Sequence, residues 1–233
     1  MRVSVIIPAY NEAASIGRVL GDIPAAHVSD VIVVDSDSTD ETQKVALRNG
    51  ARVVREPRRG YGRACLTGLK HARDPEVVVF LDGDYSDRPS ELPLLIAPIC
   101  EGRADIVIGS RLAGNLAPGA LPWHSRWGNR LAARLISMLC GLSLTDLGPF
   151  RAARFDLLRS LELRELTYGW PVEMIVRGSL RGWRIIEVPV SYHRRIGKSK
   201  ITGTFKGSIA AAWHVFSAIV KYRILDNQHR SRT

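Results

Sequence analysis

The stretch Val77-Val-Val-Phe-Leu-Asp-Gly-Asp84 decides the fold of this chain. Its five apolar residues, three of them β-branched, are typical of a strand in a parallel sheet that is covered on both faces. In an extended segment the side chains at positions i and i+2 point the same way, so Asp82 and Asp84 are expected to share one side. They follow the strand directly, which puts both carboxylates at the carboxyl edge of the sheet, where ligands of doubly wound folds bind.

Apolar runs of the same kind lie before and after this stretch. They occupy residues 3–7, 31–34 and 106–108. Helix patterns separate the runs, over residues 16–20, from a capping box of Ser38 and Glu41 to near Gly50, and over 66–69. This alternation of strand and helix predicts an α/β fold with a doubly wound, mostly parallel, Rossmann-like sheet in a single domain.

The second half of the chain is less regular. Helices are predicted over residues 123–140 and 171–180, and short strands over 184–188 and 190–192. A last helix, over 204–225, is amphipathic and carries basic residues and a tryptophan. Such a helix is typical of peripheral attachment to an anionic membrane surface; packing on the domain and a homodimer interface are the alternatives.

The composition suits a globular protein with an anionic partner. The 233 residues are 45% hydrophobic and 24% charged, which excludes global disorder. The net charge is +10, and residues 181–233 hold eleven Lys or Arg against Glu187 and Asp226. This excess favours nucleic acid, anionic lipid or phosphorylated substrates. No zinc spacing or RNA-recognition pattern is present, so no nucleic acid is expected beyond a nucleotide.

The sequence contains no recognisable targeting signal. No secretory leader precedes the first strand, and no apolar run reaches the ~20 residues that span a bilayer. Cys65, Cys100 and Cys140 form no CxxC pair, which favours free thiols in a reducing compartment. These features predict a cytoplasmic protein, either free or peripheral on the cytoplasmic face of a membrane.

The carboxylates of Asp82 and Asp84 form a candidate metal site. Two close carboxylates repel unless one is protonated or a cation sits between them. A hard divalent ion, Mg²⁺ or Mn²⁺, that is also held by diphosphate oxygens resolves this repulsion. Gly83 would allow a ligand to approach closely. The alternative is a polar turn, because Asp and Gly are common turn residues.

The loops that follow the first two strands carry candidate nucleotide ligands. Pro8-Ala-Tyr-Asn-Glu12 lacks the G-x-G-x-x-G pattern, which counts against NAD or FAD. Tyr10 can stack on a base, and Asn11 and Glu12 can bond a sugar or begin a helix. Asp35 ends the second strand, where an acid can accept hydrogen bonds from a ribose or a base.

A basic loop with two glycines, Arg58-Arg-Gly-Tyr-Gly-Arg63, opens the third predicted helix. Helix starts with flexible glycines suit anion binding, so Gly60 and Arg63 are candidate phosphate ligands. The motif is not a P-loop, because no Gly-Lys-Ser/Thr follows. A solvated turn is the alternative.

Four motifs thus stand in order: Pro8-Ala-Tyr-Asn-Glu12, Asp35 with Ser38-Thr39-Asp40, Gly60-x-Gly62 and Asp82-Gly-Asp84. Together they resemble the glycosyltransferase family 2 enzymes of the GT-A fold. Later segments resemble its dolichol-phosphate mannose synthase, or polyprenyl-phosphate glycosyltransferase, branch: Ile108-Gly-Ser-Arg111, Trp127-Gly-Asn129, Asp146-Leu-Gly-Pro-Phe-Arg151 and Arg194-Arg-Ile-Gly-Lys-Ser-Lys200. The resemblance extends to about residue 205.

The resemblance implies metal-dependent, inverting transfer of a hexose from a UDP- or GDP-sugar to a polyprenyl phosphate. It implies a GT-A domain over residues 1–203, with a nucleotide-sugar-binding half, 1–110, and an acceptor half, 111–203. The amphipathic helix and basic tail, 204–233, would follow.

The site residues are assigned on the loops and the resemblance together. Asp82 and Asp84 would hold Mg²⁺ or Mn²⁺, and Asp84 and Arg111 would be catalytic. The nucleotide-sugar would contact Pro8, Tyr10, Asn11, Glu12, Asp35, Gly60, Arg63, Asp82 and Gly83. The acceptor phosphate would contact Arg126, Arg151, Arg194, Ser199 and Lys200.

The chain departs from the family pattern at several positions. Gly83, Tyr85 and Ser86 stand where Ala, Leu and Gln are common, which leaves open whether Ser86 or water completes the metal site. Ser36 follows Asp35 in place of a second Asp or Asn, and Asp146-Leu-Gly-Pro-Phe150 replaces Asp-x-x-Ser-Gly-Phe. These changes point to a different donor sugar or acceptor.

Other functions remain as alternatives. A family 2 enzyme with a non-lipid hydroxyl acceptor would need a general base, and Glu173 is the candidate unless it is an ion-pairing helix residue. A nucleotide-sugar pyrophosphorylase is disfavoured, because the first loop lacks a glycine-rich basic segment. A non-catalytic nucleotide-sugar-binding protein is disfavoured by the intact Asp82 and Asp84.

Overall fold

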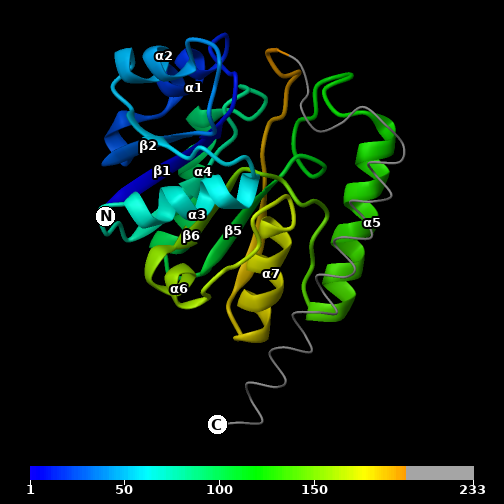
Figure 1. The fold of residues 1–233 in the computed structure, drawn as a ribbon. Helices are drawn as coiled ribbons and strands as arrows, with labels where there is room; N and C mark the ends of the chain where they lie inside the picture. The colour runs from blue at the N-terminus through cyan, green and yellow to red at the C-terminus, as the bar shows by residue number, and fades with distance from the viewer. Residues whose placement is uncertain (198–233) are drawn as a thin grey trace.

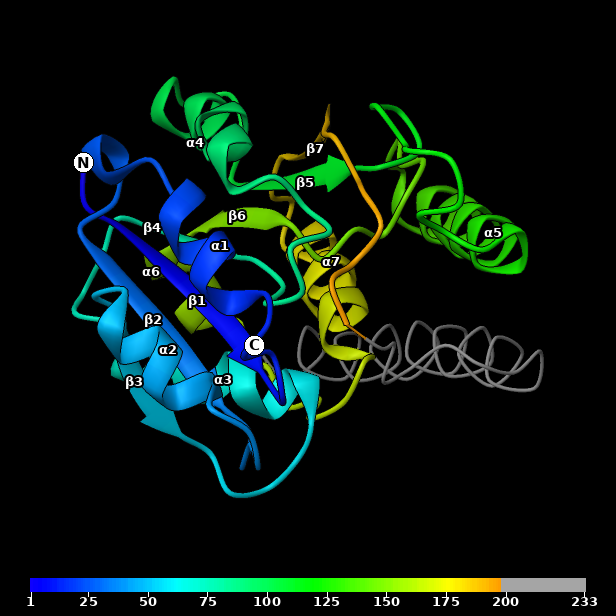
Figure 2. The same ribbon diagram turned by 90° about the horizontal axis from the view of Figure 1, so that it is seen from above.

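A mixed sheet of seven strands organises residues 1–197, which are the residues that the computed structural model describes. The strand order is β3-β2-β1-β4-β6-β5-β7 (Figures 1 and 2). The strands are β1 (Val3–Ala9), β2 (Asp30–Asp35), β3 (Arg52–Arg55), β4 (Val77–Phe80), β5 (Ile106–Ser110), β6 (Arg151–Arg154) and β7 (Ile185–Pro189). The helices are α1 (Ile16–Asp22), α2 (Thr42–Arg48), α3 (Tyr61–His71), α4 (Leu92–Cys100), α5 (Trp123–Cys140), α6 (Phe155–Ser160) and α7 (Trp170–Leu180), with short 3₁₀ turns at Ala25–His27 and Pro89–Glu91.

The predicted α/β fold with a mostly parallel sheet is confirmed. Strands β1, β2, β3 and β4 pair in parallel, and β5 pairs in parallel with β7. Strand β6 is antiparallel to both β4 and β5 and lies between them. The sequence did not predict β6, because Arg-Ala-Ala-Arg has little intrinsic strand preference and forms a strand only through its two neighbours.

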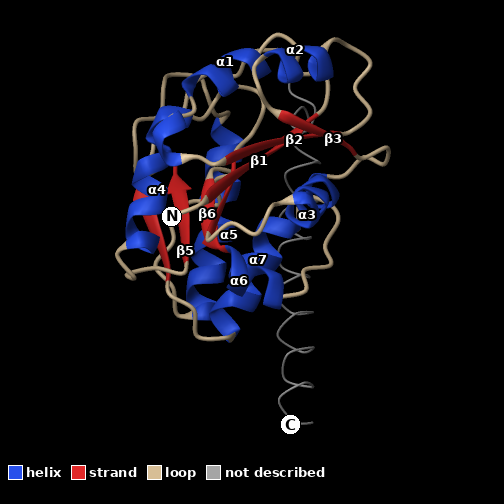
Figure 3. Cartoon of the chain, turned by 90° about the vertical axis from the view of Figure 1, so that its left-hand side faces the viewer, coloured by secondary structure: helices blue, strands red, loops and turns tan. Residues whose placement is uncertain are grey.

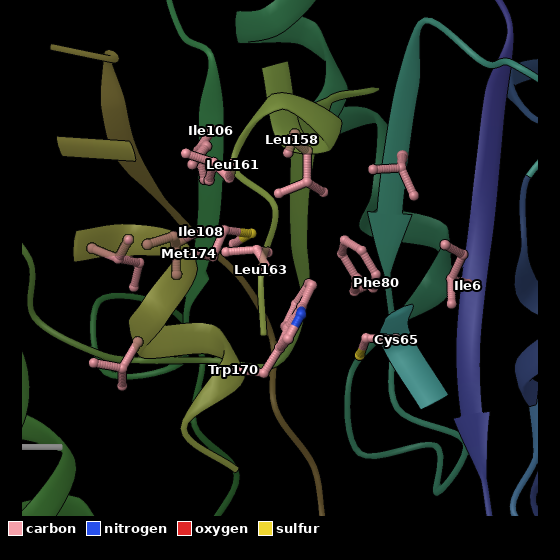
Figure 4. Close-up of a cluster of buried hydrophobic side chains, with 14 of the residues drawn as sticks. Ile6, Cys65, Phe80, Ile106, Ile108, Leu158, Leu161, Leu163, Trp170 and Met174 are labelled. Carbon is pink, nitrogen blue, oxygen red and sulfur yellow. The ribbon is translucent and has the colours of Figure 1, made fainter. Parts of the chain in front are cut away.

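Helices cover both faces of the sheet, as a doubly wound fold requires (Figure 3). Alternate residues of β4 enter different cores, because successive side chains of a strand point to opposite faces. Val77 and Val79 join the core under α1, α2 and α4. Val78 and Phe80 join the core under α3, α5, α6 and α7, where Phe80 packs edge-on against Trp170 at 4.7 Å between ring centroids (Figure 4).

Two local predictions need correction. The capping box is wrong: α2 begins at Thr42, and Ser38 Oγ instead accepts a hydrogen bond from Asn11 N. Residues 190–192 form no strand; Tyr192 makes only isolated bridges to Asp87 and Leu116. The remaining predicted segments, the helix over 204–225 and the basic tail, lie outside the described residues. No helix in the described part of the chain is long and apolar enough to cross a membrane.

Candidate active site

The carboxyl ends of β1, β2, β4, β5 and β7 meet at one edge of the sheet, because these strands run in the same direction. The loops that carry the predicted site residues leave the sheet there. These are Pro8 to Glu12 after β1, Asp35 at the end of β2, Asp82 to Asp84 after β4, and Arg111 after β5. Residues 190–197 after β7 complete the edge. The predicted position of Asp82 and Asp84 at the carboxyl edge of the sheet is therefore confirmed, and the other loops leave the sheet at the same edge.

Asp84 is held in place from two sides. One of its carboxylate oxygens, Oδ1, accepts hydrogen bonds from the backbone N of Ser86 at 3.0 Å and from Ser86 Oγ. The other, Oδ2, forms an ion pair with Arg195 Nη1 at 3.1 Å. In this structure Ser86 therefore orients the Asp84 carboxylate through two hydrogen bonds.

Arg195 is a site residue that the sequence analysis missed. The same loop also bonds the motif through its backbone, because Ile196 N donates to the carbonyl of Asp84 at 2.9 Å. The basic excess after residue 181 pointed to this region, but two consecutive arginines gave no means of telling which one reaches the carboxylate. Only the ion pair identifies Arg195.

The carboxyl group of Asp82 is a weaker acid than an ordinary aspartate. Its burial, and next the neighbouring Asp84 carboxylate, raise the pKa of Asp82 to about 7. Gly83 between them faces the first loop: a Cβ there would lie 3.4 Å from Glu12 Cγ and 3.5 Å from the Pro8 carbonyl oxygen. An alanine would therefore fit against the surrounding protein atoms.

Asp35 carries an unsatisfied oxygen. The side chain is fully buried, and its Oδ2 accepts hydrogen bonds from Ser38 N at 3.1 Å and Gln43 Nε2 at 2.7 Å. Its Oδ1 is buried with no hydrogen-bond partner among the described residues. Buried polar atoms without partners are rare, so this oxygen points to a ligand donor such as a base N–H or a ribose hydroxyl.

The first loop is fastened to the loop after β2. Asn11 has a positive φ of 52°, and its Oδ1 accepts a hydrogen bond from Thr39 N at 2.8 Å. Glu12 N donates to Thr42 Oγ1 at 2.7 Å. Tyr10 lies under the guanidinium of Arg59, whose carbon is 4.0 Å from the ring centroid. Asn11 therefore shapes the site, while Tyr10 stands at its rim beside a cation.

The start of α3 is packed against the segment that precedes α7. Gly62 N and Arg63 N donate to the carbonyls of Thr167 and Leu166, at 3.2 and 3.0 Å. A Cβ on Gly60, which has a φ of +147°, would collide with the Leu166 carbonyl. The backbone amides of Gly62 and Arg63 therefore bond protein carbonyls in this structure and do not point at a phosphate site. The Nε of Arg63 is buried without a partner among the described residues and remains a candidate donor.

Arg111 is fixed by a buried bidentate ion pair. Its Nε and Nη2 lie 2.7 and 2.8 Å from the two carboxylate oxygens of Asp146, and its backbone N donates to Asp146 at 3.0 Å. Burial would raise the pKa of Asp146, but the Arg111 charge and these hydrogen bonds hold it below the ordinary value. The Arg111 guanidinium also lies over the Tyr192 ring, 5.0 Å from its centroid.

The residues predicted to bind the acceptor phosphate do not form one group. Arg151 is fully buried, with guanidinium contacts to the carbonyls of Pro171 and Gly148. Arg126 is exposed on α5, and Arg194 is exposed with its Nε donating to the Pro118 carbonyl at 3.1 Å. Ser199 and Lys200 lie outside the described residues. Arg151 therefore faces the core, whereas Arg126 and Arg194 are exposed.

Comparison with known proteins agrees with this geometry. Residues 4–162 match the model of the family described as glycosyl transferase family 2. The chain belongs to this family. An uncharacterised glycosyltransferase of Mycobacterium bovis is 40% identical over 219 residues, which cover 92% of this chain and 98% of the relative.

Two further relatives have named activities. The undecaprenyl-phosphate mannosyltransferase of Micrococcus luteus is 36% identical, over 89% of this chain and 90% of its own length. The dolichyl-phosphate hexose transferase of Haloferax volcanii is 34% identical, over 95% of each chain. The branch suggested by the later motifs is thus represented among the relatives of this family 2 transferase.

Solved structures support the fold. Glucosyl-3-phosphoglycerate synthase from Mycobacterium tuberculosis aligns with a TM-score of 0.75 and 26% identity, over 94% of this chain and 78% of that chain. That crystal contains Mn²⁺, uridine diphosphate and phosphoglyceric acid, and another crystal of the enzyme contains Mg²⁺ and uridine diphosphate.

Glu173 of this family 2 transferase is placed as a structural residue. It is fully buried at the start of α7 and accepts hydrogen bonds from the backbone N of Arg164 and of Glu165, at 3.0 and 2.7 Å. Arg177 pairs with it at 3.3 Å. Glu173 thus shapes the segment whose carbonyls hold the start of α3. Its surroundings favour the ion-pairing alternative over a general base.

We therefore expect Glu173→Gln to lower stability more than activity. The glutamine amide has one acceptor oxygen in place of two, so the change should cost about 1–3 kcal/mol of unfolding free energy. Urea denaturation would measure this, with the exposed Glu101→Gln as a control. Turnover by the folded enzyme should stay within about tenfold of wild type, whereas loss of a general base costs about 10²–10⁴-fold.

Proposed function

We propose that this family 2 transferase moves a hexose from a UDP- or GDP-sugar to a polyprenyl phosphate, with a divalent metal ion and inversion at the anomeric carbon. The observation that carries the proposal is the carboxylate pair Asp82 and Asp84 at the carboxyl edge of the sheet, directly after β4. The names of the two polyprenyl-phosphate relatives support the acceptor, and the uridine diphosphate complexes of the structural neighbour support the donor.

The donor nucleotide would lie between the ends of β1 and β2. The unsatisfied Oδ1 of Asp35 would accept from the base or ribose, and the buried Nε of Arg63 would donate to the nucleotide. Tyr10 would stack beside the base, with Pro8, Asn11 and Glu12 shaping that wall. Gly60 would contribute by letting the start of α3 pack against Leu166, and Gly83 by leaving space for the donor beside Asp82 and Asp84.

The residues after β4 fit Mg²⁺ or Mn²⁺. The raised pKa of Asp82 results from burial next to a second carboxylate, and a divalent cation would relieve both effects. No group of three or more His, Cys, Asp or Glu side chains within residues 1–197 is placed to hold a metal. Asp82 and Asp84 would therefore supply the protein's ligands, with diphosphate and water completing the shell. The bound ion would supply positive charge to the leaving diphosphate.

The acceptor phosphate would need no general base, because it is already an anionic nucleophile. One of its oxygens would attack the anomeric carbon. The bond from that carbon to the diphosphate oxygen would break, and its electron pair would leave with the nucleoside diphosphate. Arg111, fixed by Asp146, would stabilise the developing charge, and Arg194 and Arg126 would receive the acceptor. A single displacement inverts the anomeric centre.

The proposal is tested with purified protein, Mn²⁺ and a panel of UDP- and GDP-sugars, with and without a short polyprenyl phosphate. Released UDP or GDP is measured. Release that requires the lipid phosphate supports the proposal and identifies the donor. Release without lipid would replace the acceptor by a hydroxyl compound or water. No release from any donor would contradict the proposed substrates.

Arg195 occupies the position of a counter-ion for the carboxylates, and this leads to a prediction about metal affinity. A positive charge beside Asp84 opposes a second cation there, so Arg195→Gln should tighten Mn²⁺ binding in the absence of donor, by about tenfold. Titration of free Mn²⁺ by electron paramagnetic resonance would measure this. Arg194→Gln is the matched control, since Arg194 contacts a carbonyl instead. Weaker Mn²⁺ binding by Arg195→Gln would contradict the idea.

Metal binding should also depend on pH. Because the pKa of Asp82 is about 7, this carboxyl holds a proton below that pH and must release it when the ion binds. Mn²⁺ affinity should therefore fall as pH drops below about 7, approaching tenfold per pH unit. Calorimetric titration across this range would show it. Asp82→Asn should bind Mn²⁺ weakly at every pH, and a wild-type affinity that does not change with pH would contradict the prediction.

A further inference from the structure

The side of α5 that faces away from the domain carries large exposed apolar side chains. Four large side chains, Trp123, Trp127, Leu131 and Met138, are exposed by 69%, 67%, 57% and 76%. The opposite side of α5, with Ala132, Ala133 and Ile136, is buried against the core. By contrast, within the described residues Leu47 on α2 and Leu94 on α4 are each the only large apolar side chain exposed on their helix. Contiguous exposed apolar surface of this kind marks an interaction site.

A row of arginines runs beside these side chains. Arg126, Arg130 and Arg134 are exposed at intervals of four residues, and α5 contains no Asp or Glu. At 100° per residue, the three arginines and the four apolar side chains fall within an arc of about 140°. We call these seven residues the α5 face. It combines two tryptophans, aliphatic side chains and cations in one continuous stripe.

Charge complementarity indicates what covers the α5 face. A second copy of the chain would bring the same arginine row against itself across a two-fold axis. The chain's own C-terminal part is also basic, with eleven Lys or Arg against two acids over residues 181–233. An anionic lipid surface is complementary to both features: tryptophan and aliphatic side chains enter the interfacial region, while arginines meet the headgroup phosphates.

The α5 face is connected to the edge that carries the site. Residues 111–122 lead from Arg111 to α5 and bond the loop after β7, through Ala117 N to the Tyr192 carbonyl at 2.9 Å and through Arg194 Nε to the Pro118 carbonyl. Figures 1 and 2 both show α5 at the margin of the molecule, beyond β5 and β7 and on the side away from β3.

We propose that the α5 face docks on an anionic lipid bilayer and so holds the acceptor side of the site at the membrane surface. This deepens the proposed function, which needs a lipid phosphate as acceptor. The α5 face would be a membrane-docking surface separate from the predicted helix over 204–225. Docking requires neither donor nor acceptor, so it can be tested even if the proposed reaction is wrong.

The test is co-sedimentation of the full-length chain with phosphatidylcholine vesicles that contain or lack phosphatidylglycerol, without substrates. The variant is Trp123→Ser/Leu131→Ser. The matched control is Leu47→Ser/Leu94→Ser, which removes two exposed apolar side chains elsewhere. We expect wild type and control to bind the anionic vesicles, more weakly at high salt, and the α5 variant to bind at least about tenfold more weakly.

Three results would overturn the proposal. The first is an α5 variant that binds the vesicles as tightly as wild type. The second is a lipid-free wild type that light scattering shows to be a dimer while the variant is a monomer, since the face would then be a protein interface. The third is a variant that unfolds at a clearly lower urea concentration than the control, since the face would then be covered by the chain itself.

Discussion

Asp84→Asn is expected to abolish transfer while leaving the protein folded. The change removes the negative charge that would hold the metal, and with it several kcal/mol of transition-state stabilisation. A loss of about 4 kcal/mol corresponds to a rate about 10³-fold lower. The asparagine oxygen can still accept the hydrogen bonds from Ser86, so the local fold should persist. Turnover is measured as nucleotide release with saturating donor and lipid phosphate.

The control for this prediction is Asp37→Asn. Asp37 lies at the same edge after β2, is 53% exposed, and pairs with Arg55 at the surface. Its φ of 62° is one that asparagine adopts readily. Activity of Asp37→Asn should therefore remain near wild type. An Asp84→Asn enzyme that stays within about tenfold of wild-type turnover would exclude Asp84 as a metal ligand.

The second large effect is expected from Arg111→Met, and it concerns stability. Arg111 is 6% exposed and Asp146 is fully buried, so the substitution leaves a buried carboxylate without its charge partner. Breaking one half of a buried ion pair costs about 3–5 kcal/mol. For a chain of this size the thermal midpoint should fall by roughly 10 °C. Thermal and urea denaturation would measure the loss.

The double variant Arg111→Met/Asp146→Leu separates the two roles of Arg111. Replacing both charges by apolar side chains should recover at least half of the lost stability, because no unpaired charge remains buried. Transfer activity should stay low in the double variant, because the positive charge that we propose to stabilise the leaving nucleoside diphosphate is still missing. A double variant that is stable and active would show that Arg111 serves the fold alone. If it is no more stable than Arg111→Met, the ion-pair argument is wrong.

The family, the sheet and the convergence of the site loops were predictable because they depend on local patterns. Continuous apolar runs specify strands that are buried on both faces, and the change of period between them specifies helices. Asp82 and Asp84 stand at the end of one such run, and Asp35 stands at the end of another. The positions of these three residues at the edge of the sheet were therefore predictable. None of these inferences depends on which residues from distant parts of the chain pack against one another.

Residues whose role depends on a distant partner could not be assigned in the same way. Glu173 was a candidate base because it is an isolated acid on a predicted helix, and only the backbone amides of residues 164 and 165 show what it holds. Gly60 and Gly62 suggested an anion site, but the carbonyls of residues 165–167 explain them. Arg151 belongs to one of the family motifs and was predicted to contact the acceptor phosphate, but it begins strand β6, which lies between β4 and β5.

The sequence by itself determined the α/β sheet, the carboxylate pair at its edge and membership of glycosyl transferase family 2, because apolar periodicity and short ordered motifs are local properties. The tertiary structure alone decided that Arg195 and Ser86 hold Asp84, that Arg111 is locked by Asp146, and that the apolar side of α5 is exposed. Ion pairs, hydrogen bonds between side chains and solvent exposure depend on segments that are far apart in the chain. Which segments meet is set by how the sheet and its loops pack together.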